Sequence, residues 1–137
     1  MGLRLLQDKM KAYLAIKFYE DGRNKEVIES IDNILKSLGI DSNIVIRDIE
    51  KYGKVKINED KLMELSFKLI DNSDILIIEF SEKGVGLGIE AGYAYSKNKP
   101  IIVIAKKGSD ISATLKGIAR QIIFYDNINE IKSKILK

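Results

Sequence analysis

Residues 75–94 read ILIIEFSEKGVGLGIEAGYA, an apolar run followed by a glycine-rich segment and a stretch suited to a helix. The run Ile75–Phe80 is typical of a buried parallel strand, because both faces of such a strand are covered and its apolar residues need not alternate with polar ones. We expect a helix over Leu87–Lys97. The stretch therefore predicts a strand–loop–helix unit, the building block of a parallel α/β sheet.

The same alternation of apolar runs and amphipathic segments extends along the chain. Further strands are expected over 12–18, 44–46, 101–105 and 121–124, and further helices over 25–38, 59–70, 112–118 and from 127 onward. Asn24 and Asn58 stand where they could cap helices, and Asn127 with Glu130 has the spacing of a capping box.

Five strands alternating with helices predict right-handed crossovers and a parallel sheet covered on both faces. We therefore expect one domain over residues 1–137, an α/β protein built as a three-layer α/β/α sandwich. Its five-stranded parallel sheet would have the order 2-1-3-4-5, flavodoxin-like or Rossmann-like. Ligands bind such sheets beyond the carboxyl ends of the strands, where loops 19–23, 81–88 and 106–111 would meet.

Composition excludes several kinds of chemistry. Of 137 residues, 45% are hydrophobic and 31% charged, and the net charge of +3 comes without a basic stripe. Nucleic acid is therefore not an expected partner. The chain has neither cysteine nor histidine, which excludes disulfides, thiolate nucleophiles, imidazole catalysis and the usual zinc ligands. Proton transfer is left to Asp, Glu, Lys, Tyr or water, and no cofactor or metal is expected.

Membrane association is not expected either. The longest apolar runs are far shorter than the ~20 residues needed to cross a bilayer, and residues 1–11 contain no apolar core of a signal peptide. We expect a cytoplasmic protein.

Gly84, Gly86 and Gly88 alternate with apolar residues after the third expected strand. A dinucleotide-binding fingerprint would follow the first strand with a different spacing, so this segment does not indicate such a site. The glycines form either a tight strand-to-helix turn or a stretch of backbone that comes close to a substrate.

Glu90 follows these glycines and is the candidate catalytic residue. Carboxylates are common in the first turn of a helix, where the macrodipole favours negative charge. The same placement would keep a carboxylate nucleophile ionised. Tyr93 lies one turn further on, where it could pack against the sheet or hydrogen-bond near Glu90 as part of a substrate site.

Three polar residues near the expected carboxyl edge are candidate contacts to phosphate or sugar hydroxyls. Arg23 precedes a helix N-terminus, a place suited to phosphate. Lys17 falls within the first expected strand, near the carboxyl edge of the sheet, and Ser112 opens a short helix. Each could instead belong to a charged surface turn or a helix cap.

Several of these segments resemble the nucleoside 2-deoxyribosyltransferase family. The resemblance lies in Ser73–Ile78, Gly84–Ala94 and Lys99–Ile104, while Ser112–Gly117 looks closer to the branch of 2′-deoxynucleoside 5′-phosphate N-hydrolases. It covers most of the chain and is most specific over residues 74–104. It implies a flavodoxin-like fold and cleavage of the N-glycosidic bond of deoxynucleosides or their monophosphates.

The resemblance also implies roles for residues. The family's catalytic glutamate falls on Glu90, which would attack the anomeric carbon to form a glycosyl-enzyme, in the manner of retaining glycosidases. The phosphate-binding serine of the hydrolase branch falls on Ser112 and often reaches a neighbouring subunit's site. A homodimer or higher homo-oligomer is therefore implied.

The sequence departs from the family at two acidic positions. Aspartates usual in the family are replaced by Ser66 and, in comparison with the transferases, by Gly84. Of the phosphate loop after the first strand only Gly22 and Arg23 match. Either Glu20, Asp21 or Glu82 supplies the proton that the departing base needs, or the chain binds nucleotides and cleaves them poorly.

Three hypotheses follow. The first is an N-glycosidase or deoxyribosyltransferase acting on nucleosides or nucleoside 5′-monophosphates through Glu90. The second is a nucleotide-binding or sensing module that performs no catalysis. The third is a TIR-like glycohydrolase of a nicotinamide dinucleotide, because such enzymes also use one glutamate on a similar sheet.

Overall fold

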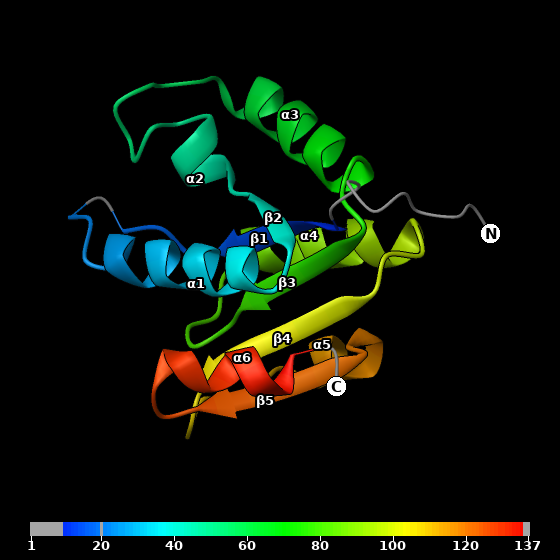
Figure 1. The fold of residues 1–137 in the computed structure, drawn as a ribbon. Helices are drawn as coiled ribbons and strands as arrows, with labels where there is room; N and C mark the ends of the chain where they lie inside the picture. The colour runs from blue at the N-terminus through cyan, green and yellow to red at the C-terminus, as the bar shows by residue number, and fades with distance from the viewer. Residues whose placement is uncertain (1–9, 20, 136–137) are drawn as a thin grey trace.

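A computed structural model describes residues 10–19 and 21–135, which form a five-stranded sheet between two layers of helices (Figure 1). All neighbouring strands are parallel, and their order is β2-β1-β3-β4-β5. The predicted fold class and strand order are confirmed. The strands are β1 (Met10–Ile16), β2 (Ile40–Asn43), β3 (Ile75–Glu79), β4 (Ile101–Lys106) and β5 (Gln121–Tyr125).

The helices alternate with these strands along the chain. They are α1 (Lys25–Ser37), α2 (Val45–Asp48), α3 (Glu59–Asp71), α4 (Val85–Ser96), α5 (Ala113–Ile118) and α6 (Ile131–Lys134), with a 3₁₀ turn η1 (Ile128–Glu130) before the last. Within the described residues, no helix is long and apolar enough to cross a bilayer.

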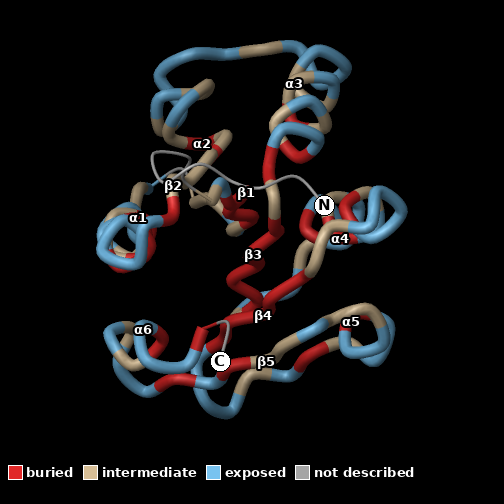
Figure 2. Tube along the Cα trace, turned by 45° about the vertical axis from the view of Figure 1, so that its right-hand side comes forward, coloured by how far each residue is buried: buried red, intermediate tan, exposed pale blue. Residues whose placement is uncertain are grey.

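Side chains of the strands alternate between two apolar layers. Leu14 and Ile77 face the layer that contains α1 and α6, while Tyr13 and Ile78 face α3, α4 and α5. β3 is buried throughout and β1 and β4 over most of their length, whereas the edge strands β2 and β5 are only partly buried. α1 with α6 stand opposite α4 with α5 (Figure 2). β1 and β3 lie side by side in register Tyr13↔Leu76, and the strand order reverses direction between them.

The second strand is not where the sequence predicted it. We expected it at 44–46, whereas β2 is Ile40–Asn43 and the apolar run enters the turn of α2. The reason is burial: Ile44 and Ile46 reach the core from that turn. An edge strand needs backbone pairing on one side only, so the polar sequence at 40–43 can form β2.

The predicted helix caps were partly wrong. Neither Asn24 nor Asn58 makes a side-chain cap hydrogen bond, and the Asn24 amide instead donates to the Lys17 carbonyl. The capping box of Asn127 and Glu130 is present and opens η1. This hydrogen bond holds the residue before α1 against the residue that follows β1.

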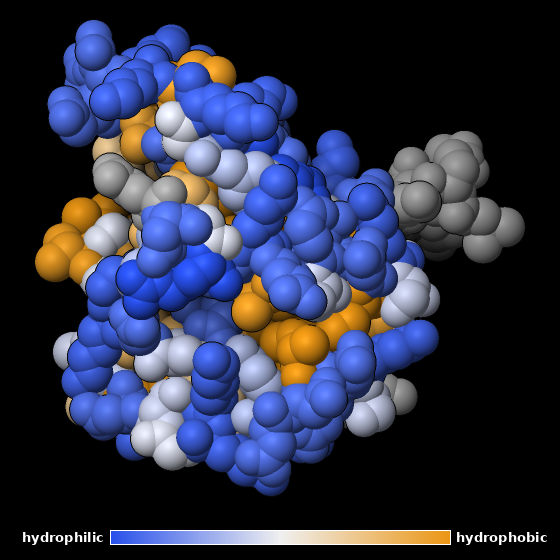
Figure 3. Space-filling view, turned by 90° about the vertical axis from the view of Figure 1, so that its left-hand side faces the viewer, coloured by the Kyte–Doolittle hydropathy of each residue, from blue (hydrophilic) through white to orange (hydrophobic). Residues whose placement is uncertain are grey.

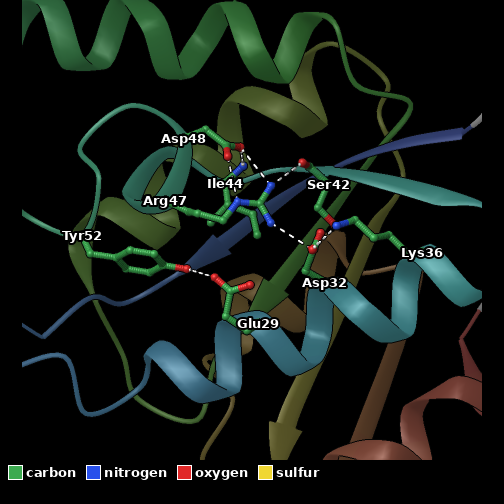
Figure 4. A network of polar contacts seen from close by, with 8 residues as sticks. All are labelled: Glu29, Asp32, Lys36, Ser42, Ile44, Arg47, Asp48 and Tyr52. Carbon is green, nitrogen blue, oxygen red and sulfur yellow. Dashed lines mark hydrogen bonds and ion pairs between the residues drawn. The ribbon is translucent and has the colours of Figure 1, made fainter.

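A polar network fastens α2 and the loop after it onto α1 (Figure 4). Asp32 of α1 is 2% exposed and pairs with Arg47 at 3.0 Å and with Lys36 at 2.9 Å. Burial raises the pKa of Asp32, but hydrogen bonds from Lys36 and Arg47 outweigh it, and the pKa lies below its usual value.

Asp32→Ala should therefore destabilise the protein by about 3 kcal/mol at pH 7, because it leaves Arg47 without its buried partner. The depressed carboxyl pKa means that the contribution is complete above pH ~4 and is lost as pH falls further. Urea unfolding at several pH values measures this. Glu26→Ala, an exposed change in the same helix, should stay within ~0.5 kcal/mol of wild type; equal losses in both variants would contradict the role of the network.

Candidate active site

Glu90 lies in the second turn of α4 and faces β1. The hydroxyl of Tyr13, from the middle of β1, donates a hydrogen bond to its carboxylate. The expectation of a first-turn acid was wrong, because α4 begins at Val85 and has no acidic residue in its first turn. The carboxylate is therefore not held ionised by the end of the helix.

Burial sets the electrostatics of Glu90. Withdrawal from water raises the pKa of this carboxyl to about 7, while the hydrogen bond from Tyr13 acts in the opposite direction. Burial and the adjacent Glu90 charge likewise raise the pKa of Tyr13 far above its usual value. Near neutral pH Glu90 is thus divided between a carboxylate and a carboxylic acid, the condition suited to a catalytic group.

A cavity of about 210 Å³ opens beside this pair. Apolar side chains of β1, α2 and α3 form most of its wall. The polar groups on it are few, as in most small-molecule sites: they are Tyr13, Glu50, Ser66 and Glu90.

Gly86 lines the same cavity four residues before Glu90, on the same face of α4. A Cβ added at Gly86 would meet no atom within 4 Å, so the missing side chain leaves open space above the carboxylate. The glycines at 84, 86 and 88 do not have positive φ angles. Their effect at this site is therefore space for a ligand rather than a strained turn.

The other predicted site residues divide between two further cavities. Lys17 and Arg23 line one of about 220 Å³ on the α1 side of the sheet. Gly84, Gly88 and Ser112 line one of about 410 Å³ between α4 and α5. The structure thus brings Gly86 to Glu90 and distributes the remaining candidates around it.

The two predicted phosphate contacts on the α1-side cavity, Lys17 and Arg23, already have partners. Arg23 pairs with Asp21 at 3.0 Å and lies 4.3 Å from the centre of the Tyr19 ring, and Lys17 is 3.7 Å from Glu82. All four charged side chains are largely exposed, so these ion pairs are weak and exchangeable. Lys17 lies just beyond the end of β1, not within the strand as predicted.

A buried carboxylate that the sequence analysis missed forms the floor of this cavity. Glu79, 6% exposed, ends β3 and accepts hydrogen bonds from the Ser81 amide at 2.8 Å, the Ser81 hydroxyl at 2.6 Å and the Tyr125 hydroxyl. With its oxygens occupied in this way, Glu79 joins the ends of β3 and β5 and is a structural group.

Tyr93 lies apart from the cavity of Glu90. Its ring stacks on Phe67 with the ring centres 4.1 Å apart, and its hydroxyl lies 2.9 Å from an Asp71 oxygen. These contacts join α3 to α4, so the geometry gives Tyr93 a packing role and does not bring it to the predicted substrate site.

Comparisons with known proteins agree with this architecture. No family model matches the chain. A candidate 2′-deoxynucleoside 5′-phosphate N-hydrolase of Thermofilum pendens is 24% identical over 139 residues, which cover 92% of both chains.

Two solved structures share the fold. The CMP N-glycosidase of Clostridium botulinum superposes with a TM-score of 0.68 at 20% identity, covering 91% of this chain and 96% of that one. A 2-deoxyribosyltransferase of Bacillus psychrosaccharolyticus gives 0.70 at 17% identity, covering 92% and 93%. At these identities the superpositions establish the fold alone.

The raised pKa of Glu90 predicts that Glu90→Gln stabilises the protein at alkaline pH. The folded state keeps the proton between pH 4.5 and about 7 while the unfolded chain loses it, so wild-type stability falls with rising pH across this window. The variant lacks that fall and should be more stable by roughly 2–3 kcal/mol at pH 8.

Urea unfolding at pH 4 and pH 8 measures the difference, which should vanish at pH 4, where the carboxyl is protonated in both states. Glu59→Gln, at the exposed start of α3, should show little dependence on pH. A Glu90→Gln variant that is no more stable than wild type at pH 8 would contradict the burial of the charge.

Proposed function

We propose that the protein is an N-glycosidase or deoxyribosyltransferase that cleaves the N-glycosidic bond of nucleosides or their 5′-monophosphates, with Glu90 as nucleophile. The observation that carries the proposal is the Tyr13-bonded carboxylate of Glu90 on a cavity kept open by Gly86. The cavity adjoins β1 and lies beside the reversal in strand order, where sheets of this type bind ligands.

The reaction begins with the ionised Glu90. One of its oxygens forms a bond to the anomeric carbon while the bond from that carbon to the base nitrogen breaks, and the electron pair leaves with the base. Tyr13 directs the carboxylate and its hydrogen bond favours the ionised form. Water or a second base then attacks the same carbon and releases Glu90.

Lys17 and Arg23 are proposed to contact the 5′-phosphate. Ile16, the last residue of β1, lines both the cavity of Glu90 and that of the two cations. A nucleoside monophosphate could place its sugar against Glu90 and its phosphate among the cations, which would exchange their exposed carboxylates for the ligand.

In a homodimer, Ser112 would belong to the substrate site of the partner subunit. Ser112, with Gly84 and Gly88, lines a cavity separate from that of Glu90 in the same chain. Beside it α4 exposes Val85 at 82% and Ile89 at 49%, one turn apart. We propose that this apolar face pairs with a second copy, so that Ser112 and the glycines serve a partner's site. Figure 3 shows the face of the molecule at which the strands end, where some hydrophobic side chains are visible among mostly hydrophilic ones.

Incubation with a panel of nucleosides and nucleoside monophosphates tests the activity, with free base measured by chromatography. Glu90→Gln should lower the rate by at least ~10³-fold, because it removes the nucleophile, whereas Glu59→Gln should retain wild-type activity. Tight nucleotide binding without base release would indicate the non-catalytic module. Release of nicotinamide from the dinucleotide would indicate the TIR-like reaction.

Arg23→Ala tests the phosphate contact. If the guanidinium binds phosphate, KM for a monophosphate should rise about tenfold or more, while cleavage of the matching nucleoside should be unchanged. Steady-state kinetics on the two substrates measure the difference. Lys68→Met, an exposed cation on α3, is the control, and an equal effect of Arg23→Ala on both substrates would exclude a phosphate contact.

A further inference from the structure

We propose that Glu50 is the acid–base residue of the Glu90 cavity, protonating the departing base and then activating the water that attacks the glycosyl-enzyme. This inference rests on the proposed glycosidase function. It assigns a catalytic role to a residue that the sequence analysis did not single out.

Glu50 reaches the cavity from a different segment than Glu90. It follows α2, and its side chain lines the same wall as Tyr13, Ser66 and Glu90. Among the described residues that line this cavity, the acids are Glu50 and Glu90. Cleavage of an N-glycosidic bond needs a nucleophile and a proton donor, and these two carboxyl groups meet both needs within one space.

The backbone around Glu50 is firmly held. Its amide donates to the Val45 carbonyl at 3.1 Å, and its carbonyl accepts from the amides of Gly53 and Val55 at 3.0 Å. The next two residues, Lys51 and Tyr52, have φ angles of 49° and 56°, a left-handed conformation uncommon for residues with a side chain. This turn reverses the chain immediately after Glu50 and leaves its side chain on the cavity.

The polar contacts shown in Figure 4 anchor the residues on both sides of Glu50 to α1. On one side Arg47 binds Asp32, and on the other the Tyr52 hydroxyl donates to Glu29 of α1. Glu50 stands between these two anchors. A catalytic group held in this way requires little rearrangement when substrate binds.

The surroundings of Glu50 suit proton transfer. Burial raises the pKa of its carboxyl above the usual value. The titratable groups on the cavity with it are Tyr13 of β1 and Glu90 of α4, and the negative charge of Glu50 adds to the rise in the pKa of Tyr13. Ser66 of α3 does not offer an alternative donor, because its hydroxyl is bonded to the Leu62 carbonyl at 2.8 Å.

Two of the donors suggested by the sequence do not line this cavity. Asp21 is exposed and paired with Arg23, and Glu82 lines the cavity on the α1 side of the sheet. Glu20 lies outside the described residues. Neither Asp21 nor Glu82 is among the residues that line the cavity of Glu90.

Glu50 gives up a proton in the first step and recovers one in the second. A proton passes from the Glu50 carboxyl to the base as the C1′–N bond breaks and the C1′–O bond to Glu90 forms. Water then loses a proton to the Glu50 carboxylate while its oxygen bonds to C1′ and the bond to Glu90 breaks. Glu50 ends protonated and Glu90 ionised, as both began.

The test compares substrates that do and do not need a proton donor. Glu50→Gln should lower kcat/KM for the natural nucleotide by ~10²–10⁴-fold. A 4-nitrophenyl 2-deoxyriboside, with or without the 5-phosphate as the wild type prefers, leaves as a phenolate without protonation. On it, the first step should fall less than about tenfold, whereas Glu90→Gln should lose activity on both substrates.

The pH profile gives a second readout. Wild-type kcat/KM should be bell-shaped, because Glu90 must be ionised and Glu50 protonated. The alkaline limb should disappear in Glu50→Gln, and Glu50→Asp should restore part of the activity on the natural nucleotide. Matching thermal unfolding curves establish that the variants are folded, and Glu59→Gln is the control acid.

The outcomes separate the two proposals. If the wild type releases no base from any nucleotide, the proposed function fails. If the wild type is active and Glu50→Gln cleaves both substrates at wild-type rates with an unchanged pH profile, the assignment of Glu50 fails while the proposed function stands. Equal large losses on both substrates would also overturn it, because they would indicate a positioning role.

Discussion

The site depends on a single electrostatic constraint, the withdrawal of the Glu90 carboxyl from water with Tyr13 as its hydrogen-bond donor. Burial raises the pKa to about 7, so at neutral pH the fold carries a charge in a poorly solvated position. This arrangement is costly to stability, and proteins tolerate such costs mainly where function requires them. In the proposed reaction the same environment would strengthen the interaction of the carboxylate with the positive charge that develops on the sugar.

That constraint is met by elements far apart in the chain. Tyr13 comes from β1, Glu90 from the helix after β3, and Glu50 from the segment after β2. The order β2-β1-β3 brings these residues together, because β1 lies between the strand that precedes Glu50 and the strand that precedes Glu90. The cavity is thus a consequence of topology, and the Asp32–Arg47 pair holds α2, which forms part of its wall, against α1.

The sequence was informative where a pattern is local. Apolar runs predicted the sheet and its order, and Glu90 was chosen from its place after the glycines. The start of α4 was misjudged because Gly86 and Gly88 each weaken a helix by ~1 kcal/mol, whereas burial of Leu87, Ala91 and Ala94 against the sheet extends it to Val85. That two-residue difference moved Glu90 from the helix end into the interior.

Glu50 could not be found in the same way. Nothing in the polar stretch after β2 distinguishes it from neighbouring charged residues, because its partial burial comes from α2, the left-handed turn and the contacts to α1. Each of these is a tertiary feature. Both carboxyl groups lie on one small cavity, and burial raises the pKa of each. In the proposed reaction Glu90 begins as a carboxylate and Glu50 as a carboxylic acid, so the site must hold one proton on Glu50 when the substrate binds.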